Sequence, residues 1–196
     1  MTQANPRSCG VSASVSMAAA ILISVPVTFA AATMPAMAQG ASDIAIGKQI
    51  APVPITIPSH VPPASVYLGS YIVNAVAACN NCHSNNPWAP NGNPFMGFTK
   101  LTNTSCYLNG GRSFQGGLFH SRNITPDASG KPNGITLAQF VQVMRTGADL
   151  KNPVPGHLLQ SMPWPAFQDM ADNDLNAIYD YLSSIPSLPL GGTSPC

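Results

Sequence analysis

The stretch Cys79-Asn80-Asn81-Cys82-His83 reads C-x-x-C-H, and it decides what kind of fold this chain can adopt. Two intervening residues place the two thiols about one helical turn apart. At that spacing both thiols can bond to the vinyl groups along one edge of a porphyrin, and the histidine then reaches the iron from one face. The pattern is typical of c-type haem attachment. It occurs once, so the sequence predicts one covalent haem c held by Cys79, Cys82 and His83.

Other interpretations of a C-x-x-C pair have their own requirements. A redox-active dithiol calls for a thioredoxin-like βαβ pattern, which the sequence lacks. A zinc site needs a second pair of ligands at similar spacing, and none is found. A plain structural disulfide between the two cysteines is also conceivable. The histidine that follows directly favours haem attachment.

The ligand opposite His83 is a separate question. Met162 opens the string Met162-Pro163-Trp164-Pro165, whose prolines stiffen the loop and keep the residue before them extended. A thioether on such a loop can bind iron with little entropy left to lose, and thioether ligation suits electron transfer. We therefore expect Met162 to bind the iron together with His83. Met96, a histidine such as His120 or His157, or an open position are the alternatives.

The chain divides into four predicted segments. Residues 1–38 form a secretory signal peptide, with an apolar run from residue 17 to 32 and a small-residue cleavage site ending at Ala38. The proline-rich stretch 39–64 favours extended chain and is interpreted as a linker or a surface wrap. A haem domain follows over 65–190, and 191–196 are a C-terminal tail. Export predicts a periplasmic protein without a membrane span after cleavage.

Composition excludes some classes of partner. The 196 residues include 8 basic and 7 acidic side chains, a net charge of +1. A nearly neutral chain with so few charges has no electrostatic footprint for nucleic acid. Of the remaining cysteines after export, Cys106 and Cys196 have no assigned role. They either pair in the oxidising compartment or leave the terminal residue as a free thiol, and the sequence leaves both readings open.

Three helices are predicted from apolar residues at helical spacing, over about 65–78, 137–146 and 173–184. Thr136 is expected to cap the second helix and Gly147 to follow its end. Between residues 84 and 134 the periodicity is lost. Long irregular loops of this kind are compatible with a compact domain when a haem supplies the core.

The chain resembles the class I c-type cytochromes, and more narrowly the cytochrome subunits and domains of periplasmic alcohol (quinoprotein) dehydrogenases. The resemblance runs from about residue 69 to 186. It rests on the motifs Gly69-x-Tyr71-Ile72, Asn123-Ile124-Thr125-Pro126-Asp127, Arg145-x-Gly147, Met162-Pro163 and Asp174-Leu175-x-Ala177-Ile178-Tyr179-x-Tyr181-Leu182. It implies an all-α cytochrome c fold, with three or more helices wrapped around the haem. It also implies His83 and Met162 as axial ligands, and close contact of Gly69 with the helix that carries Tyr181 and Leu182.

The expected function is electron carriage rather than catalysis. The resemblance implies a periplasmic dehydrogenase as electron donor and another cytochrome or an oxidase as acceptor. Two alternatives stay open. One is a haem sensor or peroxidase-like protein with a displaceable sixth ligand. The other is a non-catalytic subunit that anchors a dehydrogenase through residues 39–64.

Overall fold

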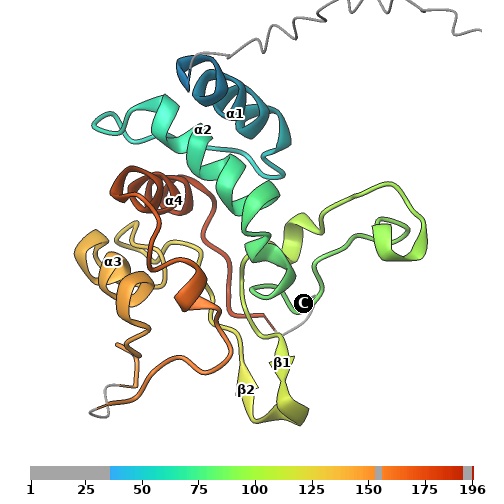
Figure 1. Ribbon diagram of the computed structural model, residues 1–196. Helices are drawn as coiled ribbons and strands as arrows, with labels where there is room; N and C mark the ends of the chain where they lie inside the picture. Colours follow the sequence, from blue (N-terminus) through green and yellow to red (C-terminus); the bar gives the residue numbers. More distant parts are fainter. Residues whose placement is uncertain (1–35, 153–155, 192–195) are drawn as a thin grey trace, which may run out of the picture. The chain divides into compact units, whose positions relative to one another are not determined.

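The computed structural model describes residues 36–152, 156–191 and 196, and all of them belong to the unit Met34–Cys196 (Figure 1). Most of the predicted signal peptide, residues 1–35, lies outside the described residues. Its expected cleavage site, after Ala38, falls in the first turn of a helix. None of the described helices is long and apolar enough to cross a membrane.

The described part of the chain contains four α-helices, a π-helical turn, several short 3₁₀ turns and one β-hairpin. In chain order they are α1 (Ala36–Ile50), α2 (Pro63–Tyr71), η1 (Ile72–Val76), η2 (Cys79–Asn81), η3 (Pro94–Met96), η4 (Thr104–Cys106), β1 (Ser113–Phe114), η5 (Gln115–Gly117), β2 (Phe119–His120), α3 (Leu137–Thr146), η6 (Trp164–Ala166) and α4 (Asp172–Ser184).

The prediction of an all-α cytochrome c fold is wrong. Strands β1 and β2 pair antiparallel, with Phe114 opposite Phe119, in a two-stranded sheet. Between them Gly116 and Gly117 adopt positive φ angles of 69° and 100°, which glycine reaches without a steric penalty. The Gln-Gly-Gly turn between two phenylalanines was the missed hairpin signal. Short 3₁₀ turns and irregular chain make up much of the rest between α2 and α3, so helices alone do not form the walls of the domain.

The prediction that residues 39–64 form an extended linker is also partly wrong. Residues 39–50 belong to α1, which packs against α2. Only residues 51–62 are free of helix, which their prolines disfavour, and they include a turn at Ser59 and His60. This part wraps along the domain: the Thr56 amide donates to the Ser184 carbonyl at 2.8 Å, and Val53, Ile55 and Ile57 pack against the core.

The three predicted helices are present. Helix α2 continues through η1, so the first helical stretch ends at Val76. In α3, Thr136 is the N-cap and Gly147 follows the helix end, both as expected; the structure adds a capping box between Thr136 and Gln139 and a left-handed backbone at Gly147. Helix α4 begins at Asp172, with Ala171 as the N-cap residue.

The core forms where α2 crosses α4. Val66 and Val73 meet Leu175, Tyr181 and Leu182, all at most 2 % exposed. Gly69 allows this crossing, because a Cβ at that position would overlap the Ala177 carbonyl and lie 2.8 Å from Tyr181 Cβ. The close contact that the resemblance implied at Gly69 is therefore confirmed.

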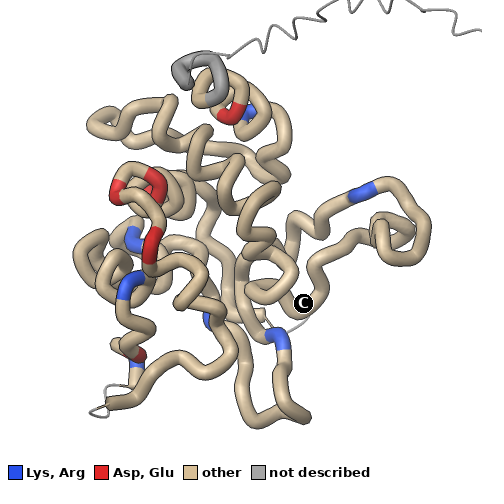
Figure 2. The backbone as a smooth tube through the Cα atoms, in the orientation of Figure 1, with Lys and Arg blue, Asp and Glu red and all other residues tan. Residues whose placement is uncertain are grey.

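Charges are separated along the chain. Residues 44–126 carry four basic side chains and no acidic one, whereas six of the seven aspartates follow, three of them in α4 (Figure 2). Asp172 and Asp174 lie in the first turn of α4, where the helix dipole favours negative charge.

Candidate cofactor site

The C-x-x-C-H motif begins directly after the long helical stretch. Ala78 breaks the helix with a left-handed backbone at φ 48°, and Cys79 to Asn81 then form the short turn η2. The His83 amide donates to the Cys79 carbonyl at 2.8 Å, which closes the loop of the motif. Neither Cys79 nor Cys82 is in a disulfide. The plain structural disulfide between them is therefore not formed, and both thiols are available.

His83 is held in one tautomer by its backbone partner. Its Nδ1 lies 2.8 Å from the Arg122 carbonyl oxygen. A carbonyl can only accept, so Nδ1 carries the proton and Nε2 keeps a free lone pair. Burial lowers the pKa of His83, outweighing the opposite effect of the Arg122 carbonyl. A neutral imidazole with one nitrogen anchored by a hydrogen bond is how metal-binding histidines are generally oriented.

The thiol of Cys79 is not activated. Burial raises its pKa to about 12, with a further upward contribution from Cys82. Redox-active C-x-x-C pairs instead have a lowered thiol pKa, which supplies the attacking thiolate. The environment of Cys79 thus gives no support to the dithiol interpretation.

The four predicted site residues, Cys79, Cys82, His83 and Met162, line one cavity of about 540 Å³. That volume lies within the range of about 300–1,000 Å³ that is typical of small-molecule and cofactor sites. Most of its walls are apolar, as a porphyrin requires. The apolar side chains come from the hairpin, from α3 and α4, and from the connecting loops: Phe114, Leu118, Phe119, Ile124, Ile135, Phe140, Val143, Met144, Leu158, Leu159, Phe167, Ile178 and Leu182.

The polar groups of the cavity lie in a few places. Arg122 and Lys151 supply positive charge, and Arg122 pairs with Asp149 at 2.6 Å. The two carboxylates of a haem would find cationic partners here. The residues present thus fit the group: two thiols and a neutral imidazole at one side, apolar walls, and basic side chains for the propionates.

The Met162 loop is fixed to α3 and α4. The Trp164 indole covers Gly147, where a Cβ would collide with the ring. Arg145 donates to the Gln168 carbonyl and forms an ion pair with Asp172 at 2.7 Å. Met162 is itself half-buried and packs against the core. The loop thus holds its thioether at the cavity wall.

The competing ligands have different positions. Met96 is 71 % exposed and does not line the cavity, which removes it as a rival to Met162. His120 and His157 both line the cavity and are exposed. Of the ligands named as alternatives, Met162 and these two histidines are therefore the ones that share the cavity with His83.

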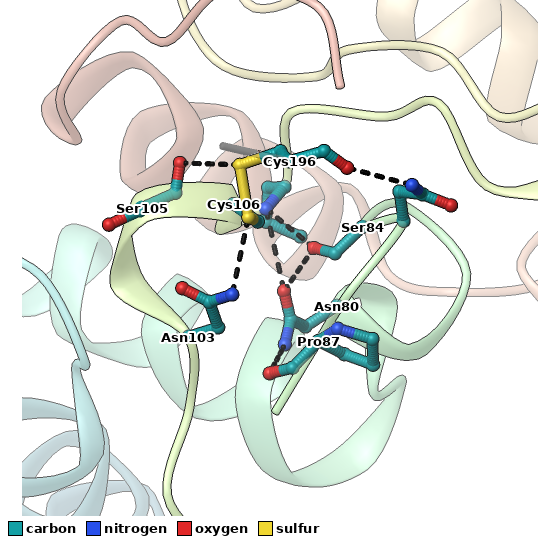
Figure 3. Close-up of a disulfide and its surroundings, with 9 residues drawn as sticks. Asn80, Ser84, Pro87, Asn103, Ser105, Cys106 and Cys196 are labelled. Atoms are coloured by element: carbon teal, nitrogen blue, oxygen red, sulfur yellow. Dashed lines mark hydrogen bonds between the residues drawn. A yellow bond between two sulfur atoms is a disulfide. The ribbon is translucent and has the colours of Figure 1, made fainter. Parts of the chain in front are cut away.

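Cys106 and Cys196 form a disulfide with their Cα atoms 5.5 Å apart (Figure 3). The reading that pairs them is confirmed, and the free terminal thiol is excluded. The sequence alone gave no means of deciding this, because the two residues are 90 positions apart.

The sequence analysis did not predict several residues that line the cavity. Phe114, Leu118 and Phe119 enter the cavity wall through the unpredicted hairpin. Arg122 contributes through its carbonyl, which no side-chain pattern reveals. In the described parts of the chain, no three His, Cys, Asp or Glu side chains gather as a metal site.

A scan against protein-family models and a search of curated proteins found no match to this chain.

Proposed function

We propose that this chain is an exported monohaem c-type cytochrome that carries single electrons between periplasmic redox proteins. The observation that carries the proposal is the placement of His83. Its Nδ1 is tied to the Arg122 carbonyl, and it shares one largely apolar cavity with Cys79, Cys82 and Met162.

Attachment requires no external oxidant. The Cys79 and Cys82 thiols would each add across one vinyl group, with the sulfur bonding to one vinyl carbon and the thiol hydrogen going to the other. Both cysteines are free for this addition. When bound, the haem supplies an iron that alternates between the ferrous and ferric states.

The protein's part is to hold that iron in one environment. His83 offers Nε2 from one side, and the stiff Met162 loop offers a thioether from another part of the cavity wall. Two strong ligands that stay bound favour electron transfer over chemistry at the metal, and a thioether raises the reduction potential. The apolar walls restrict water and favour the less charged ferrous state.

Electrons enter and leave where the cavity reaches the surface. Leu118, Phe119 and Leu158 line the cavity and are 76 %, 42 % and 41 % exposed. A rim of three exposed apolar side chains fits brief contacts with redox partners, because such contacts typically bury little surface. A dehydrogenase as donor and a cytochrome or oxidase as acceptor follow from the resemblance.

A haem sensor or peroxidase-like protein is the second candidate, because His120 and His157 also line the cavity. The third, an anchoring subunit, relied on residues 39–64. Val53, Ile55 and Ile57 instead pack against the chain's own core. Little of their apolar surface is therefore left for binding a partner.

A redox titration of the purified periplasmic protein separates the first two candidates. The electron-carrier proposal predicts a reversible one-electron transition and a weak sulfur-to-iron charge-transfer band at the red end of the ferric spectrum. It also predicts no binding of carbon monoxide to the ferrous form. Rapid carbon monoxide binding and no sulfur band would favour the sensor and overturn the electron-carrier proposal.

A further inference from the structure

Asn80, an interior residue of the C-x-x-C-H motif, makes hydrogen bonds with both ends of its side-chain amide. It is 8 % exposed. Its Nδ2 donates to the Pro87 carbonyl at 3.2 Å, and its Oδ1 accepts from Ser84 Oγ at 2.5 Å (Figure 3). Ser84 Oγ in turn accepts from the Leu108 amide at 2.9 Å. The motif is thereby tied to two separate parts of the loop that follows it.

The second of those parts is itself anchored. The disulfide from Cys106 to Cys196 joins it to the C-terminal residue, and Asn85 Nδ2 donates to the Cys196 carbonyl at 2.7 Å. The Gly110 amide donates to the His83 carbonyl at 2.7 Å. The backbone of the iron-binding histidine therefore contacts the same anchored segment that Asn80 reaches through Ser84.

We propose that Asn80 is a positioning residue, which with Ser84 fixes the attachment motif against the disulfide-anchored segment 106–111. This inference rests on the proposed function. The motif then presents two thiols and one imidazole in a single geometry, and the asparagine-rich loop with its disulfide gains a role that the haem motif alone does not explain.

The energetics support a fixed arrangement. Ser84 and Leu108 are fully buried, and Asn80 nearly so. A buried polar group that loses its partner is left without any hydrogen bond, because water cannot reach it, and the folded state is destabilised. The network therefore resists rearrangement, and partners behind a metal ligand tune both its orientation and the metal.

Asn81 provides a matched control within the same motif. It is half-buried, and among the described residues only its backbone carbonyl takes part in a side-chain hydrogen bond, accepting from Arg112 at 2.7 Å. Replacing its side chain leaves that bond in place. Both asparagines occupy the variable positions between the cysteines, so any general effect of substitution there affects both.

The test compares wild type, Asn80→Ala, Asn81→Ala and Ser84→Ala, each produced in the periplasm with the haem-attachment machinery. Three quantities are measured: the fraction of chains with covalent haem, the reduction potential, and the haem-methyl shifts in the ferric proton NMR spectrum. We expect Asn80→Ala to lower the covalent fraction, shift the potential downward as water reaches the motif, and alter the methyl pattern that reports the His83 ring plane. Ser84→Ala should shift the potential in the same direction by less, since Asn80 keeps its bond to Pro87.

Asn81→Ala should match wild type in all three quantities. The inference is overturned if the potential and methyl pattern of Asn80→Ala coincide with those of Asn81→Ala. If Asn80→Ala does not fold, Ser84→Ala decides: a wild-type potential and methyl pattern in that variant overturn the inference. A wild-type protein without haem is a different result, because it contradicts the proposed function itself.

Discussion

Gly147 lies beneath the indole of Trp164, so close that a Cβ on the glycine would enter the ring. The glycine ends α3 with φ 69°, and Trp164 follows Met162 by two residues. The end of one helix therefore carries the loop that brings the methionine to the cavity.

Replacing Gly147 with alanine should both destabilise the protein and disturb Met162. Overpacking costs about 1–3 kcal/mol, and the left-handed backbone adds strain for a residue with a Cβ. We expect a lower urea midpoint and a weaker sulfur-to-iron band. Gly130→Ala is the control, because Gly130 has φ 77° and open space around its Cβ position. Equal loss of the band in both variants would contradict the role of the Trp164 contact.

Met162→Ala should remove the sulfur-to-iron band and lower the reduction potential, because thioether ligation raises it. Met96→Ala is the matched control, since Met96 is 71 % exposed and away from the cavity. A band that persists in Met162→Ala would show that another group faces His83. Replacing His120 and His157 in turn would then identify it.

The disulfide closes a separation of 90 residues. Loss of a bridge of that span should cost about 2–5 kcal/mol of unfolding free energy. We therefore expect the double variant Cys106→Ser/Cys196→Ser to unfold at lower urea than wild type. Reductant should destabilise wild type and leave the double variant unchanged. A double variant as stable as oxidised wild type would show that the bridge contributes nothing.

Alkaline pH should destabilise the protein through a buried tyrosine pair. Tyr107 and Tyr181 share a hydrogen bond of 2.8 Å, and burial, first of all, raises the pKa of each above its ordinary value of 10.0. A pKa raised by folding means that the folded state keeps its protons while the unfolded state loses them. The stability linked to the pair is thus constant below about pH 10 and falls above it.

The measurement is the free energy of unfolding in urea from about pH 8 to pH 11, on either side of the ordinary tyrosine pKa. Tyr107→Phe should be less stable at neutral pH, because Asn74 Oδ1 loses the Tyr107 hydroxyl. It should also show a shallower alkaline decline, since one titrating group is gone. Parallel curves for the two proteins would contradict this account.

Structural features that depend on residues close together in the sequence were predicted better than features that depend on tertiary contacts. The three helices and the N-cap at Thr136 followed from local patterns, whereas the close contact at Gly69 was implied only by the family resemblance. Residues 39–50 were assigned to extended chain because prolines dominate the following twelve residues, yet Gly47 packs onto α2, where Ser70 Oγ donates to its carbonyl at 2.7 Å. That tertiary contact outweighs the local composition.

The candidate site shows the same division. The C-x-x-C-H motif and the proline-stiffened Met162 loop were both identified from short sequence patterns, and the structure brings both to one cavity. The contact between His83 and the Arg122 carbonyl could not be predicted from the sequence. Every residue has a backbone carbonyl, so residue type does not show which one, 39 positions away, will meet the histidine. The hairpin consists of two two-residue strands, each with a single phenylalanine, around a glycine turn, and strands this short give no periodic signal. The all-α prediction failed there.

The intact mass of the denatured periplasmic protein tests the central claim most directly. Denaturation removes every non-covalent ligand, so only thioether-bound haem stays with the chain. The account predicts a polypeptide heavier than its amino acids by one haem, with Soret absorbance on the same species. In the double variant Cys79→Ser/Cys82→Ser that added mass should vanish. A wild-type chain with the bare polypeptide mass and no Soret band would contradict the account.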